Sequence, residues 1–187
     1  MNPPAPTMRQ RRASGLAAAL ARLANSPGDL AAARRAAGSA PDEAPALWPY
    51  TVPVGELGGR RWQDAVFYTL TLYAVHQQSQ PQPMNQQGVT VGQACAQLKA
   101  ARHSPDAIDR RFTQAVSAEQ TAVLATRLRG LVTMLRSHAI PLDYVHLAFD
   151  LQDWHDPESR RRVLSRWSRD YYRTTTPTPD TPTPQEA

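Results

Sequence analysis

Apolar residues recur every three or four positions along the stretch from Ser104 to Arg136, and this spacing constrains the fold more than any other feature of the chain. At its start, Ser104 followed by Pro105 is typical of a helix beginning. Further on, Ser117 and Gln120 match a capping box that would begin a second helix. The stretch therefore predicts two consecutive amphipathic helices. The apolar face of the second comprises Val123, Leu124, Leu128, Leu131, Val132 and Leu135.

The same helical spacing occurs on both sides of this stretch, whereas no segment shows the two-residue alternation of β-branched residues that is typical of strands. Thr90 can cap one of these helices, in which Gly92 indicates close packing against a neighbour. The sequence therefore predicts an all-α fold, a helical bundle of about eight helices in two small subdomains. Further helices are expected near residues 16–23, 26–37, 60–76, 90–98, 141–154 and 156–172. Residues 38–59 are rich in Pro and Gly, and we expect them to form an ordered loop with a turn of helix.

Composition divides the chain into five parts. Residues 1–12 contain prolines and arginines and lack apolar periodicity, so we expect them to form a disordered basic arm. Residues 174–187 are rich in Thr and Pro, and we expect them to form a disordered tail. Between them we expect an N-terminal helical subdomain, residues 13–80, and a C-terminal helical subdomain, residues 90–173. The Gln-rich residues 81–89 would connect the two as a flexible loop.

Positive charge is the strongest functional signal. The chain has 20 arginines and one lysine against 16 acidic residues, and its net charge is +5. A GC-rich genome would explain the preference for Arg over Lys, but not the excess of positive charge. A basic surface attracts polyanions, and a nucleic acid releases counterions when such a surface binds it. The predicted nucleic-acid-binding residues are Arg34, Arg35, Arg60, Arg61, Arg110, Arg111, Arg127, Arg129, Arg136, Arg160, Arg161 and Arg162.

For any one of these arginines, a solvated helix face is the simpler explanation. Pairs at i,i+4 spacing are expected between Asp106 and Arg110 and between Glu158 and Arg162. Taken together, however, the arginines outnumber the acids that could pair with them. Aromatic residues do not alternate with the arginines as they do in stacking platforms, so the sequence predicts contact with the phosphate backbone rather than with bases.

Catalytic motifs are missing from the sequence, which has no glycine-rich phosphate loop, HExxH, CxxC or GxSxG. One group of acids and histidines, Asp150, Asp153, Asp156, His146 and His155, has the composition of a metal site. Asp156, however, lies beyond a helix break and suits the N-cap of the next helix. We therefore expect no catalytic residue, no metal and no cofactor.

Cys95 is the single cysteine, so no intrachain disulfide can form, and its place on an apolar helix face predicts a buried thiol. This cysteine usage favours a reducing compartment. No stretch approaches eighteen consecutive apolar residues, so we expect no membrane segment. The sequence therefore predicts a cytoplasmic protein.

Several short motifs occur in an order and spacing that resemble the CasB family, the small subunit of type I-E CRISPR Cascade complexes. The resemblance covers about residues 15–173, and each motif is short and helical. The motifs are AARRA (32–36), WPY (48–50), RRWQDAVFYTLTLYA (60–74), TVGQAC (90–95), DRRF (109–112), LRGLVTMLR (128–136), IPLDY (140–144), DLQDW (150–154) and the W and DYY within 167–172.

This resemblance implies a non-catalytic, all-α protein, present in two copies along the belly of a ribonucleoprotein. The implied partners are crRNA, target DNA including the displaced strand, the other Cascade protein subunits and a second copy of the chain. The family says nothing of the N-terminal arm, the Gln-rich loop or the Thr/Pro tail. Carried over by position, the best candidates for phosphate contacts are Arg35, Arg61, Arg111 and Arg129, with residues 160–162 a looser match.

Two other classes of function stay open at this point. A DNA-binding regulator, either sequence-nonspecific or of the helix-turn-helix type, would also use a basic helical surface. A helix-turn-helix needs a Gly turn between short helices, whereas Gly130 lies inside a strongly predicted helix. A metal-dependent enzyme acting on DNA would need carboxylates that converge on Mg²⁺, and the scattered acids disfavour it.

Overall fold

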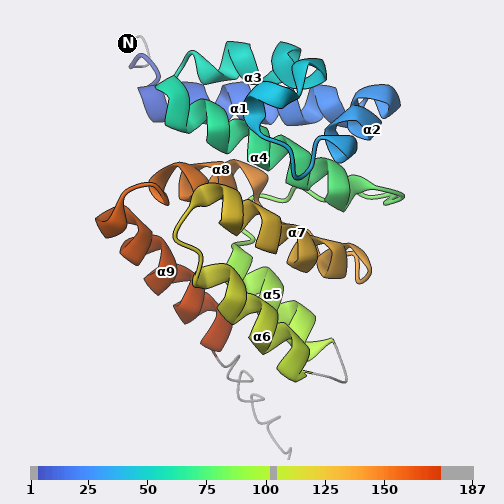
Figure 1. Ribbon diagram of the computed structural model, residues 1–187, viewed down its shortest axis with the longest axis vertical. Coiled ribbons are helices and arrows are strands. Elements are labelled where there is room, and N and C mark those ends of the chain that lie inside the picture. The colour runs from blue at the N-terminus through green and yellow to red at the C-terminus, as the bar shows by residue number, and fades with distance from the viewer. Residues whose placement is uncertain (1–3, 102–104, 174–187) are drawn as a thin grey trace, which may run out of the picture.

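The computed structural model describes residues 4–101 and 105–173, and within these ranges it contains nine α-helices and no β-strand (Figure 1). This confirms the all-α prediction. The helices are α1 (Met8–Ala24), α2 (Pro27–Arg35), α3 (Trp48–Gly55), α4 (Gly59–Gln77), α5 (Val91–Ala100), α6 (Pro105–Val116), α7 (Thr121–Arg136), α8 (Tyr144–Asp153) and α9 (Pro157–Tyr172), with short 3₁₀ turns at Pro41–Glu43 and Pro45–Leu47.

Helix α4 lies at the centre of the fold. Its N-terminal neighbours α1, α2 and α3 pack on one side of it, and α7 and α8 pack on the other (Figure 1). Apolar residues face outward from α4 on both sides, so Trp62, Phe67 and Leu70 are almost completely buried. One continuous cluster of buried residues extends from α1 to α9. The division into two subdomains at residues 81–89 therefore stays a prediction.

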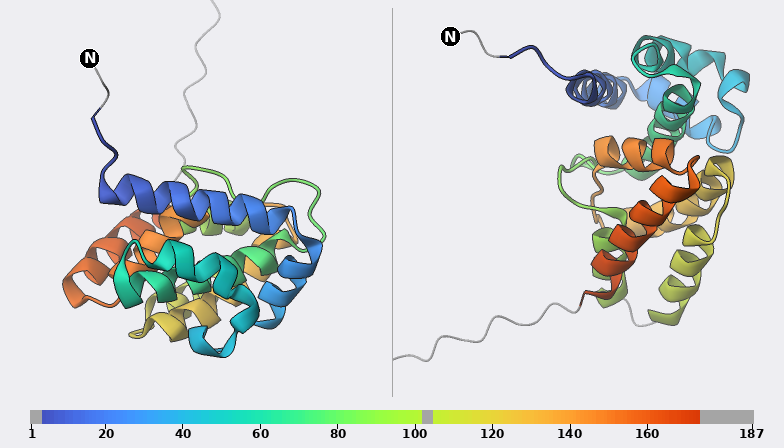
Figure 2. Two further views of the ribbon diagram at one scale, coloured as in Figure 1. Left: turned by 90° about the horizontal axis from the view of Figure 1, so that it is seen from above. Right: turned by 90° about the vertical axis from the view of Figure 1, so that its left-hand side faces the viewer.

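The first helix begins earlier than the sequence predicts. The Thr7 hydroxyl accepts a hydrogen bond from the N–H of Gln10, and the Gln10 side chain accepts one from the N–H of Thr7, which is a complete capping box. Arg12 then donates to the carbonyl of Leu57 at 2.7 Å. Helix α1 runs alongside α4 and reaches α8 (Figure 2). The predicted disordered arm is therefore wrong for residues 8–12, which belong to α1, and Arg9 and Arg12 pack on the bundle.

The Gln-rich connection is held in place by hydrogen bonds to the start of α8. The Asn85 side-chain oxygen accepts from the N–H of Tyr144 at 2.9 Å, and the N–H of Gly88 donates to Asp143 Oδ2 at 2.8 Å. The prediction of a flexible loop over residues 81–89 is wrong, because these long-range hydrogen bonds hold it in place. From the composition alone, the polar groups of this loop were expected to bond water.

Prolines shape the segment between α2 and α4. Pro53 lies inside α3 and has no N–H, so the carbonyl of Pro49 loses its helical donor. The Arg22 guanidinium of α1 donates to this carbonyl at 2.7 Å and lies 4.4 Å from the ring centroid of Tyr50. The prediction of an ordered segment with some helix is therefore correct, but α3 has eight residues, about two turns, where one turn was expected. The hydrogen bond from Arg22 replaces the one that Pro53 cannot donate.

The central helix pair is confirmed, with a different boundary. Helix α7 begins at Thr121, and Gln120 is its N-cap residue without a side-chain bond. Ser117 instead donates to the carbonyl of Gln114 at 3.0 Å, in the turn that ends α6. The predicted capping box of Ser117 and Gln120 is therefore wrong. Val123, expected in the buried face, is 37% exposed. It lies about 100° around the helix from Leu124, beyond the edge of the buried face.

Two expectations lie outside the described residues, namely Ser104 as a helix cap and the tail over residues 174–187. Of the helices that the structure does describe, none combines the length and the apolar character needed to cross a membrane.

Candidate nucleic-acid interface

Arginines of α6 and α7 share an exposed surface with the end of α2. Arg111 of α6 extends over Gly130 of α7, where an added Cβ would come 3.2 Å from its guanidinium Nη1. Arg129 of α7 donates from Nη1 to the carbonyl of Ala37, just beyond α2, at 2.7 Å. Helix α7 itself contains no acidic residue. Arg34 and Arg35 are the last residues of α2, three and two positions before Ala37. We call Arg34, Arg35, Arg111 and Arg129 together the α7 stripe.

Three other predicted arginines bond main-chain carbonyls. Arg127 donates to the carbonyl of Gln114 at the end of α6, Arg136 to a carbonyl of α4 at 3.2 Å, and Arg160 to a carbonyl in the turn before α7 at 2.8 Å. The first two bonds satisfy carbonyls in the last turns of α6 and α4, which lack a helical donor. A guanidinium has five N–H donors and a permanent charge, so each of these arginines keeps donors for a phosphate.

Two predicted arginines form ion pairs on their own helices. Arg60 Nε lies 3.0 Å from Asp64 Oδ1, and Arg162 Nη1 lies 3.2 Å from Glu158 Oε1. The second pair confirms the i,i+4 pairing predicted from the sequence. Both arginine side chains are about two-thirds exposed, so these pairs contribute little to stability and compete only weakly with an anionic ligand.

The remaining predicted arginines lack a polar partner within residues 4–101 and 105–173. The predicted pair of Asp106 and Arg110 is therefore wrong. Unpaired guanidinium groups on helices are available to an anionic ligand, and they lie in four places: the C-terminal end of α2, the start of α4, the outer face of α6 and the outer face of α9. They are Arg34, Arg35, Arg61, Arg110, Arg111 and Arg161.

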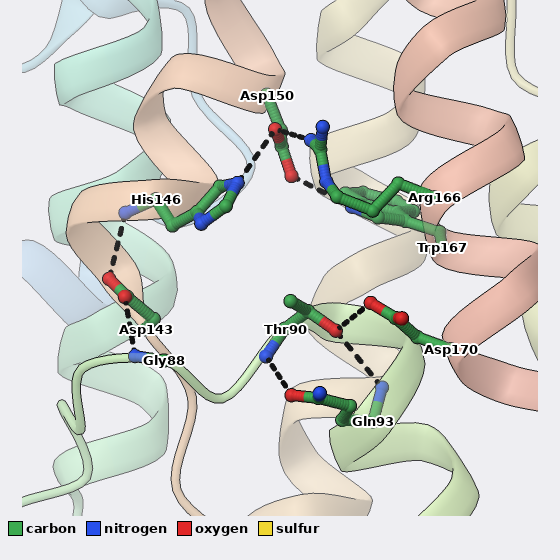
Figure 3. Close-up of polar contacts among 9 residues, drawn as sticks. All are labelled: Gly88, Thr90, Gln93, Asp143, His146, Asp150, Arg166, Trp167 and Asp170. Carbon is green, nitrogen blue, oxygen red and sulfur yellow. Dashed lines mark hydrogen bonds and ion pairs between the residues drawn. The ribbon is translucent and has the colours of Figure 1, made fainter.

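A buried carboxylate positions α9. Asp150 of α8 is 4% exposed, accepts a hydrogen bond from Trp167 Nε1 at 2.7 Å and forms an ion pair with Arg166 (Figure 3). His146 Nε2 lies 3.7 Å from the same carboxylate. Burial raises the pKa of Asp150, and the guanidinium of Arg166 opposes that shift. The network fixes α9 against α8 with its outer arginines towards solvent.

A second set of contacts fixes α9 against α5. Thr90 caps α5 through the N–H of Gln93 and donates its hydroxyl to Asp170 Oδ2 at 2.7 Å (Figure 3). A Cβ added to Gly92 would come 2.2 Å from the carbonyl oxygen of Trp167. The predicted cap at Thr90 and the predicted close packing at Gly92 are both confirmed.

Three of the acids and histidines near residue 150 have structural contacts, namely His146, Asp150 and Asp156. Asp156 Oδ2 accepts from the N–H of Ser159 at 2.7 Å, which confirms the predicted N-cap, and these hydrogen bonds lower the pKa of Asp156. In the part of the chain that the structure describes, no three His, Cys, Asp or Glu side chains are placed to hold one metal ion. Cys95 is completely buried, which confirms the buried thiol, and this burial raises the pKa of the thiol to about 12.

Gly130 is a residue of this surface whose role the sequence did not predict. From the sequence, Gly130 argues only against a helix-turn-helix, because it lies inside a predicted helix. The signal was nevertheless present, since an isolated Gly within a strong helix often marks a close approach. Here it lets the Arg111 side chain cross α7 without meeting a Cβ.

These observations define the class of the protein: an all-α bundle whose rigid helices expose arginines. The family model for CRISPR-associated protein Cse2 (CRISPR_cse2) matches residues 29–172, and the chain therefore belongs to the Cse2 family. This confirms the resemblance found in the sequence motifs. No curated protein matches the chain.

Solved structures agree with this assignment. The chain is 30% identical to CasB from Thermobifida fusca, over 88% of this chain and 94% of that chain, with a TM-score of 0.69. It is 26% identical to CasB from Thermus thermophilus, over 86% and 97% of the two chains, with the same TM-score. A chain of a CRISPR RNA-guided surveillance complex, 23% identical over 89% and 94%, shares the fold with a TM-score of 0.72.

Proposed function

We propose that the chain is a non-catalytic subunit of a Cascade-type CRISPR surveillance complex, in which it binds the backbone of guide and target nucleic acid and stabilises the R-loop in antiviral defence. Membership of the Cse2 family supports the assignment to such a complex. The observation that carries the binding role is the α7 stripe. Helices hold the backbone positions of these arginines fixed, which favours phosphate recognition, and base pairing in such complexes reads the sequence.

The proposed partners follow from this role. They are crRNA, target DNA including the displaced strand, the other Cascade protein subunits and a second copy of the chain, in the cytoplasm. A match to a chain of an RNA-guided surveillance complex supports the protein and nucleic-acid partners as a class. The arginines contact phosphates rather than bases, because the stripe contains no aromatic residue on which a base could stack.

A helix-turn-helix regulator is less well supported. The turn between α6 and α7, residues 117–120, contains no Gly, and the Arg127 guanidinium bonds both the carbonyl of Gln114 and the hydroxyl of Ser117 across it. Gly130 lies within α7, as expected from the sequence. The α6–α7 pair therefore lacks the Gly turn of that motif.

Binding of a labelled oligonucleotide by the full chain, measured by fluorescence anisotropy at several salt concentrations, tests this function. Affinity should fall steeply with salt and depend little on sequence. Arg111→Glu should weaken binding and lower the salt slope by about one, because one phosphate contact is lost. Its free energy of unfolding should change by about 0.5 kcal/mol or less, since Arg111 is exposed and lacks a polar partner among the described residues.

Arg11→Glu is the matched control. Arg11 is exposed on α1, outside the α7 stripe, and its replacement changes the net charge by the same amount. If both variants weaken binding equally, only net charge matters and the stripe has no special role. An affinity of the parent chain that stays flat between low and high salt would refute backbone binding altogether.

A further inference from the structure

A hollow lies between α4 and the N-terminus of α7. Two α4 side chains form one wall, and the turn before α7 and the first turn of α7 form the other. The corner between α8 and α9 closes its end. The lining residues are Asp64, Tyr68, Glu119, Gln120, Thr121, Ala122 and His155.

The N-terminus of α7 presents free donors to this hollow. The first N–H groups of any helix lack an intrahelical acceptor, and a side-chain cap usually satisfies one of them. Helix α7 has 16 residues and no such cap. Nor do the N–H groups of Thr121, Ala122 and Val123 find any other acceptor within the described residues. The positive end of the helix dipole lies at the same place.

Thr121 provides an independent second observation. Its side chain is only 3% exposed, and its hydroxyl oxygen has no hydrogen-bond partner in the described part of the chain. Buried hydroxyl groups are paired in most proteins, so an unpaired one at the wall of a hollow indicates a missing partner. Tyr68 adds a second hydroxyl without a described partner, and burial raises the pKa of Tyr68, which keeps it a donor at neutral pH.

The charges around the hollow do not exclude an anion. The Asp64 carboxylate is paired with Arg60 at 3.0 Å, so its charge is largely balanced. Glu119 is exposed and can turn towards solvent, and the Arg160 guanidinium lies 2.8 Å from its main-chain carbonyl. Apart from these two carboxylates, the lining offers unpaired main-chain N–H groups and hydroxyl groups, and each of them can donate to an acceptor oxygen of a ligand.

We propose that this hollow binds one phosphate of a nucleic-acid backbone, whose oxygens accept from the first N–H groups of α7 and from the Thr121 hydroxyl. The inference rests on the proposed function and adds a phosphate position that contains no arginine. Tyr68 and Ala122 also line the adjoining hollow that reaches Arg129. From Thr121 to Arg129 is about 12 Å along the axis of α7, so a strand held here continues onto the α7 stripe.

Thr121→Val tests the proposal, because it replaces the hydroxyl with a methyl group of the same size. In the free protein the change removes an unpaired buried polar group, so the melting temperature should stay equal or rise. Affinity for a single-stranded oligonucleotide at fixed salt should nevertheless fall about tenfold, because a hydrogen bond to a charged group is lost. Thr121→Ser, which keeps the hydroxyl, should bind like the parent even if it melts at a lower temperature.

Thr69→Val is the matched control. Thr69 of α4 is fully buried, and its hydroxyl also lacks a partner among the described residues, but it does not line the hollow. Its binding should match that of the parent. Unchanged affinity of Thr121→Val, or equal losses in both valine variants, would overturn the proposal. If Arg111→Glu weakens binding while Thr121→Val does not, the phosphate site alone fails; if the parent binds no oligonucleotide, the proposed function fails with it.

Discussion

The crossing of α5 and α9 predicts a large effect of a very small substitution. A Cβ at Gly92 would come 2.2 Å from the carbonyl oxygen of Trp167 and 2.7 Å from the Cβ of Asp170. Ordinary contact begins at 3.4 Å, so Gly92→Ala requires the two helices to separate by about 3.4 − 2.2 = 1.2 Å. The carbonyl belongs to the backbone of α9 and cannot rotate away, as a flexible side chain could.

The magnitude follows from two opposing effects. Overpacking against a fixed neighbour costs about 1–3 kcal/mol, and separation of the helices also lengthens the 2.7 Å bond between Thr90 and Asp170. Replacing Gly by Ala in a helix returns up to about 1 kcal/mol. We therefore expect Gly92→Ala to lower the free energy of unfolding by about 2 kcal/mol, and the melting temperature by about 4–8 °C for a chain of this size.

Gly28→Ala is the matched control, since Gly28 lies in α2 and no heavy atom would lie within 4 Å of the added Cβ. The same change should therefore stabilise the chain there, by about 0.5 kcal/mol. Urea denaturation and thermal melting of both variants measure the two signs. If Gly92→Ala is as stable as the parent, α5 and α9 do not cross at this distance, and the arrangement of the outer arginines of α9 must be revised.

Two further predictions concern pH and the N-terminus. Burial lowers the pKa of His76 to about 4, so between pH 4 and 6.5 the unfolded chain binds more protons than the folded one. The free energy of unfolding should therefore reach its full value above pH 6.5 and be about 2 kcal/mol lower at pH 5 than at pH 7.5. Urea titrations at the two pH values should find this difference greatly reduced in His76→Leu. Removing residues 1–12 should lower the melting temperature by several degrees, because Arg12 bonds the carbonyl of Leu57; an unchanged value would contradict the packing of α1.

The sequence predicted those parts of the fold that depend on local chemistry. Apolar periodicity located the central helix pair, and the caps at Thr90 and Asp156 were correct because a cap satisfies N–H groups only two or three residues away. Ser117 shows the limit of this reasoning. Its local pattern with Gln120 matched a capping box, but the chain closes α6 there instead, and the Arg127 side chain helps to hold that turn.

The arginine contacts that the sequence did not predict have a common physical origin. Arg22, Arg127 and Arg136 bond carbonyls that are distant in sequence, or lie in a turn whose conformation the sequence did not predict. The position of such a carbonyl depends on the tertiary structure, so no periodicity in the sequence reveals it. The same holds for the Gln-rich connection, whose amide groups bond the start of α8.

Bonding to a carbonyl does not remove an arginine from the binding surface. Arg129 donates to the carbonyl of Ala37 through Nη1, and its other N–H groups remain free for a phosphate. An exposed arginine that nothing holds must lose rotamer freedom when it binds, whereas this bond already restricts the Arg129 side chain in the free protein. We therefore expect Arg129 to contribute more to affinity than Arg110, which has no such partner within the described residues. The sequence did not predict these hydrogen bonds to main-chain carbonyls. The same bonds restrict the arginine side chains before an anionic ligand binds.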